Sequence, residues 1–182
     1  MDESMVERRD EAFEAGERLT VIGGKLEPGV RAPDSALESF DPSSGTLRTV
    51  HLADSAGSIR VLNVVNSLDT PVCHVETHRW DGLREDLPDA VVLQTISMDL
   101  PFAQARWAAA EGVTHQVLSS HKSEQFGREY GVLIKEWRLL QRAVFVIDEQ
   151  GQVTYAEYVA DQMREPDYDA AVQAIRALHR EH

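Results

Sequence analysis

From residue 59 onward, apolar runs typical of buried strands alternate with segments that carry helix signals. The strand-like runs are residues 59–65, 90–97, 116–119, 143–148 and 153–158, and the helical segments are residues 71–87, 101–111, 123–130 and 167–179. Asp99 can cap the second of these helices, and Gly112 is expected to end it. The last two strand-like runs flank Glu149-Gln150-Gly151, which predicts a hairpin. Strands that alternate with helices pair in parallel, whereas a hairpin pairs antiparallel. The order therefore predicts an α/β fold with a central mixed sheet flanked by helices.

The N-terminal part of the chain has a different pattern. Residues 1–17 are highly charged, and we expect an arm or a frayed helix there. Thr20-Val21-Ile22 precedes Gly23-Gly24, and two glycines supply the positive φ of a tight turn, so we expect an N-terminal hairpin at this point. A chain of 182 residues has the length of one domain, which we place at residues 18–182.

The composition excludes several classes of protein. The net charge of -13 argues against a surface for nucleic acid or anionic membrane. No apolar stretch is long enough to span a membrane, and the acidic N-terminus lacks the apolar core of a secretory signal, so we expect a cytoplasmic protein. With one cysteine in the chain, packing and not an internal disulfide must stabilise the fold.

That cysteine, Cys73, lies where a thiol is expected to be reactive. It follows the first strand-like run, and Thr70 followed by Pro71 is a helix-start signal of N-cap and first helical position. Cys73 is then the third helical residue, where free backbone N–H groups and the helix dipole favour an anion. Such sheets bind ligands beyond the carboxyl ends of their strands, which is where Cys73 is placed. A lone cysteine is more often an inert buried residue, and that alternative stays open at this point.

The residues around Cys73 carry a resemblance to a known family. Ser67-Leu68-Asp69-Thr70-Pro71-Val72-Cys73 resembles the active-site loop of the thiol peroxidases, the Tpx branch of the peroxiredoxins. Four further segments match the family in the same order, namely residues 99–107, 130–136, 140–148 and 165–168. The resemblance covers roughly residues 18–178 and implies a thioredoxin-like peroxiredoxin fold.

The resemblance also implies an activity, the reduction of hydrogen peroxide or organic hydroperoxides through a cysteine sulfenic acid. Cys73 becomes the nucleophile, Thr70 supplies a hydroxyl to the thiolate and the peroxide oxygen, and Arg142 stabilises the thiolate. Asn66 and Val72 are the expected substrate-binding residues, and neither a metal nor a cofactor is required. Without the resemblance, Thr70 is a plain N-cap and Arg142 a surface ion-pair partner.

Two positions depart from the family pattern. Asn66 replaces the proline that begins the family's loop, and Ala108 occupies the usual position of the resolving cysteine. The asparagine adds a polar side chain, and proline restored there is expected to raise or preserve the oxidation rate. Because no second cysteine is present, the implied cycle uses one cysteine and an external thiol reductant, either a thioredoxin-like protein or a low-molecular-weight thiol. We also expect a homodimer.

Three other functions compete with this interpretation. His74 and His78 share a helix face at a ligand spacing, but the sequence shows no further ligand cluster for a metal site. For a cysteine–histidine hydrolase, nothing in the sequence places a histidine base near Cys73 or a carboxamide that would orient that histidine. The serious alternative is a non-catalytic or redox-sensing relative that has kept the fold and lost efficient turnover. The absence of both the loop proline and the resolving cysteine is what such a change of role would produce.

Overall fold

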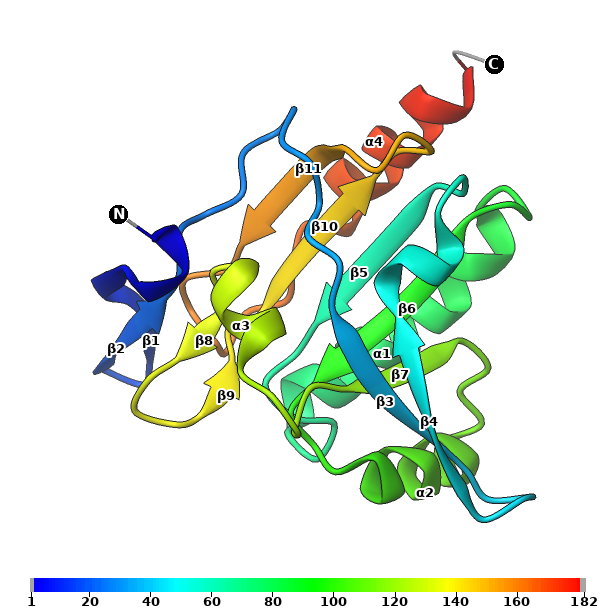
Figure 1. The fold of residues 1–182 in the computed structure, drawn as a ribbon, viewed down its shortest axis with the longest axis horizontal. Helices are drawn as coiled ribbons and strands as arrows, with labels where there is room; N and C mark the ends of the chain where they lie inside the picture. Colours follow the sequence, from blue (N-terminus) through cyan, green and yellow to red (C-terminus); the bar gives the residue numbers. More distant parts are fainter. Residues whose placement is uncertain (1, 181–182) are drawn as a thin grey trace.

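The computed structural model describes residues 2–180, and its main feature is a seven-stranded mixed sheet (Figure 1). The strand order is β11-β10-β5-β6-β7-β3-β4, in which β5, β6 and β7 are parallel and the other pairs are antiparallel. The strands are β3 (Ala36–Asp41), β4 (Thr46–His51), β5 (Arg60–Val64), β6 (Val92–Ser97), β7 (Gln116–Ser119), β10 (Ala143–Ile147) and β11 (Val153–Tyr158). This topology confirms the expected α/β fold with a central mixed sheet.

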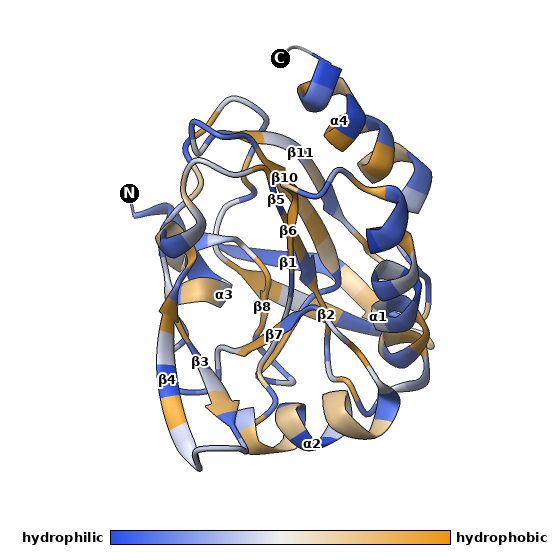
Figure 2. Ribbon diagram, turned by 90° about the vertical axis from the view of Figure 1, so that its right-hand side faces the viewer, coloured by the Kyte–Doolittle hydropathy of each residue, from blue (hydrophilic) through white to orange (hydrophobic). Residues whose placement is uncertain are grey.

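Helices and small strands cover the two faces of the sheet. On one face, α1 (Pro71–Leu83) and α4 (Tyr168–Arg180) pack against alternate residues of the strands, such as Val61 and Val146. Leu62 and Phe145 face the other core, together with residues of α3 (Gln125–Glu129). Figure 2 shows α1 and α4 on one side of the sheet and α3 on the other. No helix within residues 2–180 has both the length and the apolar character to cross a membrane.

The N-terminal hairpin exists, but its position differs from the expected one. Strands β1 (Glu7–Glu14) and β2 (Glu17–Ile22) pair antiparallel and extend through β8 (Leu133–Ile134) to β9 (Leu139–Leu140). The turn is at Ala15 and Gly16, both with positive φ, and not at Gly23-Gly24. Gly23 instead lies so close to the Arg128 carbonyl that a Cβ atom would overlap it. The frayed helix expected within residues 1–17 is therefore wrong for residues 7–14, whereas the independence of residues 18–182 as a domain stays a prediction.

Other element boundaries follow the sequence closely. Helix α1 begins at Pro71 as expected and passes at Leu83 into a short 3-10 turn, η3 (Arg84–Asp86). Helix α2 (Pro101–Glu111) ends at Gly112, which adopts the left-handed conformation of a C-terminal stop. The sequence did not predict the β3–β4 hairpin, which lengthens the sheet beyond β7. Two short 3-10 turns, η1 (Glu3–Met5) and η2 (Leu52–Ser55), complete the order.

Candidate active site

The site is built around Cys73 in the first turn of α1. Strand β5 ends at Val64, a loop follows, and Cys73 is the third residue of the helix, as expected. The side chain is fully buried, with 0 % exposure, and lies in a cluster with Val65, Leu68 and the partly buried Trp107. The thiol is therefore shielded from water on the side of α2.

Asp99 fixes the loop that precedes Cys73. The sequence suggested that Asp99 caps α2, but the N-cap of that helix is Leu100, so this expectation is wrong. The carboxylate instead accepts hydrogen bonds from Ser67 Oγ at 2.7 Å and from the Leu68 backbone N–H at 2.9 Å. Asp99 follows β6, which pairs with β5 in the sheet. A residue at the end of β6 therefore anchors the loop that leads from β5 to Cys73.

Thr70 is the N-cap residue of α1 by its backbone conformation, but its side chain makes no capping hydrogen bond. The hydroxyl donates to the carbonyl oxygen of Ser67 at 2.9 Å. Within residues 2–180 no hydrogen bond joins Thr70 to Cys73. Because its proton is engaged by Ser67, the Thr70 oxygen is left with lone pairs that can accept a hydrogen bond.

Arg142 lies directly before β10 and is buried beside Cys73, so the alternative of a surface ion pair is wrong. Its Nη1 donates to Cys73 Sγ at 3.3 Å and forms an ion pair with Glu76. Its Nη2 donates to the Gln162 carbonyl oxygen at 2.6 Å and to Asn66 Oδ1 at 3.3 Å. The sequence predicted that Arg142 and Cys73 meet, although 69 positions separate them.

Asn66 and Gln162 form a buried amide network that holds the arginine in place. Asn66 Nδ2 donates to the Leu140 carbonyl oxygen at 2.6 Å and to Gln162 Oε1 at 3.0 Å. The same Gln162 oxygen accepts the backbone N–H of Arg142 at 2.9 Å. Asn66 Oδ1 also lies 3.9 Å from Cys73 Sγ, which places this residue at the thiol as expected. Gln162 was missed, because nothing in its loop segment marks it in the sequence.

Glu76 is a second residue that the sequence analysis missed. It is fully buried on α1, three positions after Cys73, a spacing that places both side chains on one helix face. Burial raises the pKa of Glu76 to about 8, against the opposing effect of Arg142. Burial alone would lower the pKa of Arg142, but the interactions of its guanidinium with Glu76 and Cys73 outweigh burial and raise that pKa. The arginine therefore stays charged, and the carboxyl group tends to keep its proton.

An apolar hollow lies on the outer side of the same helix turn. It has a volume of about 230 Å³ and is lined by Pro71, Val72, Val75, Met163 and Glu165. Val72 is half-buried there, directly before Cys73 in the chain. Hydrocarbon-rich groups could be accommodated in this hollow, which is lined by the residue before Cys73 but not by Cys73 itself.

Comparison with known proteins agrees with this site. The model of the Redoxin family matches residues 27–172. A thiol peroxidase of Streptococcus sanguinis is 48% identical over 164 residues, covering 90% of this chain and 97% of the relative. A thiol peroxidase of Bacillus subtilis is 42% identical, covering 90% and 95%. The crystal structure of a peroxiredoxin-like protein from Aquifex aeolicus has a TM-score of 0.80 and 31% identity, covering 94% and 99%.

The chain belongs to the Redoxin family, within the thiol peroxidases. The resemblance found in the sequence is thereby confirmed, and so is the thioredoxin-like peroxiredoxin fold. The chain has one cysteine, which agrees with a thiol peroxidase that lacks the usual resolving cysteine.

Proposed function

We propose that the protein is a thiol-dependent peroxidase that reduces hydrogen peroxide or organic hydroperoxides with Cys73 as its nucleophile. The observation that carries this proposal is the 3.3 Å contact between Arg142 Nη1 and Cys73 Sγ inside a fully buried site. A guanidinium at that distance stabilises a thiolate, and the thiolate is the reactive form of cysteine. The names of the relatives in the thiol peroxidase family support the same activity.

The reaction proceeds in two stages. The Cys73 thiolate attacks one peroxide oxygen, the O–O bond breaks, and the leaving oxygen takes a proton to become water or an alcohol. The sulfur is oxidised to a sulfenic acid. An external thiol then attacks that sulfur and releases water, which leaves a mixed disulfide on Cys73. A second external thiol attacks the outer sulfur of this disulfide, displaces the Cys73 thiolate and leaves as an external disulfide.

Four neighbouring residues have roles in the first stage. Arg142 stabilises the thiolate and the charge that develops on the peroxide oxygens. Thr70, whose proton is donated to Ser67, accepts a hydrogen bond from the peroxide. Asn66 orients Arg142, and Val72 with the adjacent hollow gives the organic part of a hydroperoxide an apolar surface.

The partners follow from the single cysteine. With no second cysteine in the chain, the reductant is an external thiol, either on a thioredoxin-like protein or on a low-molecular-weight compound. We also propose a homodimer in the cytoplasm. Sedimentation velocity on the reduced protein tests the dimer, and a monomer at all concentrations would contradict it.

Stopped-flow oxidation of the reduced protein by hydrogen peroxide and by an alkyl hydroperoxide, with the sulfenic acid trapped, tests the activity. We expect oxidation far faster than that of a free thiol, and no peroxide consumption by Cys73→Ser. Oxidation at the rate of an ordinary thiol would instead favour a redox-sensing or non-catalytic role. Asn66 and Ala108, which replace the family's proline and resolving cysteine, are the observations that keep this second function in view. Turnover with an added thiol separates the two functions.

A further inference from the structure

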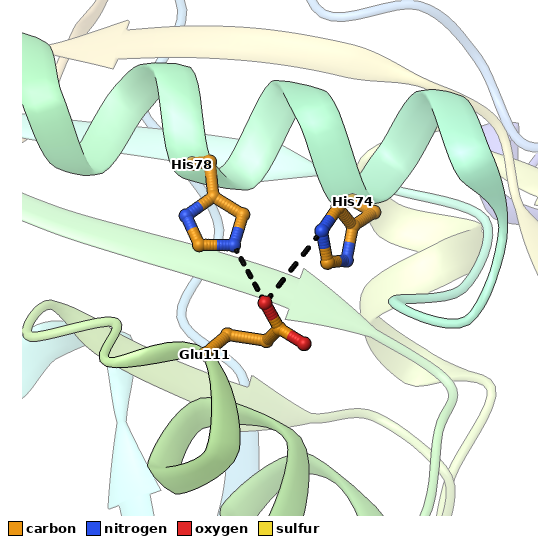
Figure 3. Close-up of side chains that lie close together, drawn as sticks. All are labelled: His74, His78 and Glu111. Atoms are coloured by element: carbon orange, nitrogen blue, oxygen red, sulfur yellow. Dashed lines mark hydrogen bonds and ion pairs between the residues drawn. The ribbon is translucent and has the colours of Figure 1, made fainter.

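A cluster of two histidines and a carboxylate lies on the surface between α1 and α2. His74 and His78 are one helical turn apart on α1, and Glu111 is the last residue of α2 (Figure 3). Both imidazole rings point toward the same carboxylate oxygen, Glu111 Oε2. That oxygen lies 3.2 Å from His78 Nε2 and 3.7 Å from His74 Nε2. The sequence showed the histidine pair but no third ligand, and the fold supplies one.

We propose that these three side chains bind a divalent transition-metal cation, and that Zn²⁺ is the ion that fits them. Zinc binds imidazole nitrogen and carboxylate oxygen at about 2.0–2.2 Å in a tetrahedral arrangement, which separates neighbouring ligand atoms by roughly 3.3 Å. The three ligand atoms of this cluster all lie within 4.8 Å of one another. Small rotations of the side chains therefore suffice to close the site around an ion.

The kind of ligand selects the ion. Magnesium and calcium prefer oxygen ligands, so two imidazoles disfavour them. Among the first-row divalent metals, affinity for such a site rises from Mn²⁺ and Fe²⁺ to Cu²⁺ and is lower again for Zn²⁺. Zn²⁺ is favoured here because it accepts imidazole and carboxylate ligands in a tetrahedral arrangement. Each of the three side chains is between 36% and 39% exposed, so an ion can enter and water can occupy a fourth coordination position.

The contacts among the three side chains do not pair both histidines with the carboxylate. Only the His78–Glu111 pair is at hydrogen-bond distance, whereas His74 Nε2 stays 3.7 Å from the carboxylate. The Trp107 ring packs against both imidazoles, with centroid distances of 5.5 and 5.8 Å, and limits their movement. Cys73 Sγ is buried against Arg142 and is not part of this cluster. The bound ion would join α1, which carries the reactive thiol, to α2.

Calorimetric titration with zinc chloride tests the site in the full-length Cys73→Ser protein, where no thiol can bind the metal. We expect one ion per chain with a dissociation constant in the micromolar range or below. Glu111→Gln and His78→Gln should each weaken binding at least tenfold, and zinc should raise the melting temperature only when the three ligands are intact. Because these side chains are partly exposed, we expect both variants to fold, which circular dichroism checks.

His51→Gln is the matched control. The His51 side chain is 51% exposed and lies 3.3 Å from an Asp34 carboxylate oxygen, so it has the same kind of partner, and the described part of the chain offers no third ligand there. Its replacement should leave zinc binding unchanged. Millimolar binding in the parent protein would overturn the proposal, as would binding that survives both Glu111→Gln and His78→Gln. The Cys73→Ser background makes this result independent of the peroxidase activity.

Discussion

Replacement of Asn66 by proline, the residue the family places there, tests whether the asparagine is part of the site. The sequence alone favoured an unchanged or faster enzyme. We expect the opposite from the structure, because the asparagine amide donates two buried hydrogen bonds, to the Leu140 carbonyl and to Gln162, and accepts one from Arg142. Proline can make none of them.

The expected magnitude follows from those three bonds. A buried donor or acceptor that loses its partner costs about 1–3 kcal/mol, and bonds to a charged group lie at the upper end. Gln162 Oε1 and Arg142 Nη2 each keep another partner, so the loss stays below three full penalties. Asn66→Pro should therefore lower the free energy of unfolding by about 3–6 kcal/mol. This is a large part of the 5–15 kcal/mol typical of a domain. Oxidation of Cys73 should slow about ten- to a hundredfold, because Arg142 loses one of the groups that orient it.

Urea unfolding measures the first quantity and stopped-flow peroxide oxidation the second. Asn63→Ala is the control, since Asn63 is a second buried asparagine, placed on β5, and among the residues described its side chain donates only to Thr95 Oγ1, at 3.1 Å. It should cost stability without an effect on the oxidation rate. If the free energy of unfolding of Asn66→Pro is within about 1 kcal/mol of the parent value and peroxide oxidises Cys73 at the parent rate, the amide network does not orient Arg142.

Three further changes probe the same site. Because the pKa of Glu76 is raised from 4.5 to about 8, the folded state holds a proton that the unfolded state loses. Its contribution to stability therefore falls as the pH rises from about 4.5 to about 8, and Glu76→Gln should remove that slope from urea unfolding curves. Arg142→Lys should slow peroxide oxidation about a hundredfold, because an ammonium cannot replace the forked guanidinium; an unchanged rate would exclude its role. Trp107 fluorescence should change when Cys73 is oxidised and the change should be absent in Trp107→Phe; a persistent signal would place the reporter at another tryptophan.

Local signals in the sequence were sufficient for the centre of the fold. The apolar runs and the Thr70-Pro71 helix start placed β5, α1 and Cys73 correctly, because burial and capping act over a few residues. The β3–β4 hairpin was missed, since β4 is mostly exposed and lacks the apolar pattern of a buried strand. The turn at Ala15 and Gly16 was missed because the Gly23-Gly24 pair is the stronger turn signal, whereas Gly23 is needed for close packing against the Arg128 carbonyl.

The candidate site could be predicted only where a family motif marked it. Thr70, Cys73 and Arg142 were found from the resemblance, and the structure brings Cys73 and Arg142 together. Gln162 and Glu111 were not found, because each reaches its partners through tertiary contacts between distant segments. Asp99 was found but was assigned the wrong role, since an aspartate before a helix is usually an N-cap. In the structure its carboxylate accepts hydrogen bonds from Ser67 and Leu68, in the loop after β5.

Arg142 explains why an asparagine is compatible with this site. One guanidinium faces two acidic groups, the Cys73 thiol and the Glu76 carboxyl, in a buried volume where two negative charges would cost more than one. Because burial raises the pKa of Glu76, the carboxyl group tends to keep its proton. The asparagine amide and Gln162 fix the guanidinium in that position. The polar residue at the start of the loop thus orients the guanidinium that contacts Cys73 Sγ.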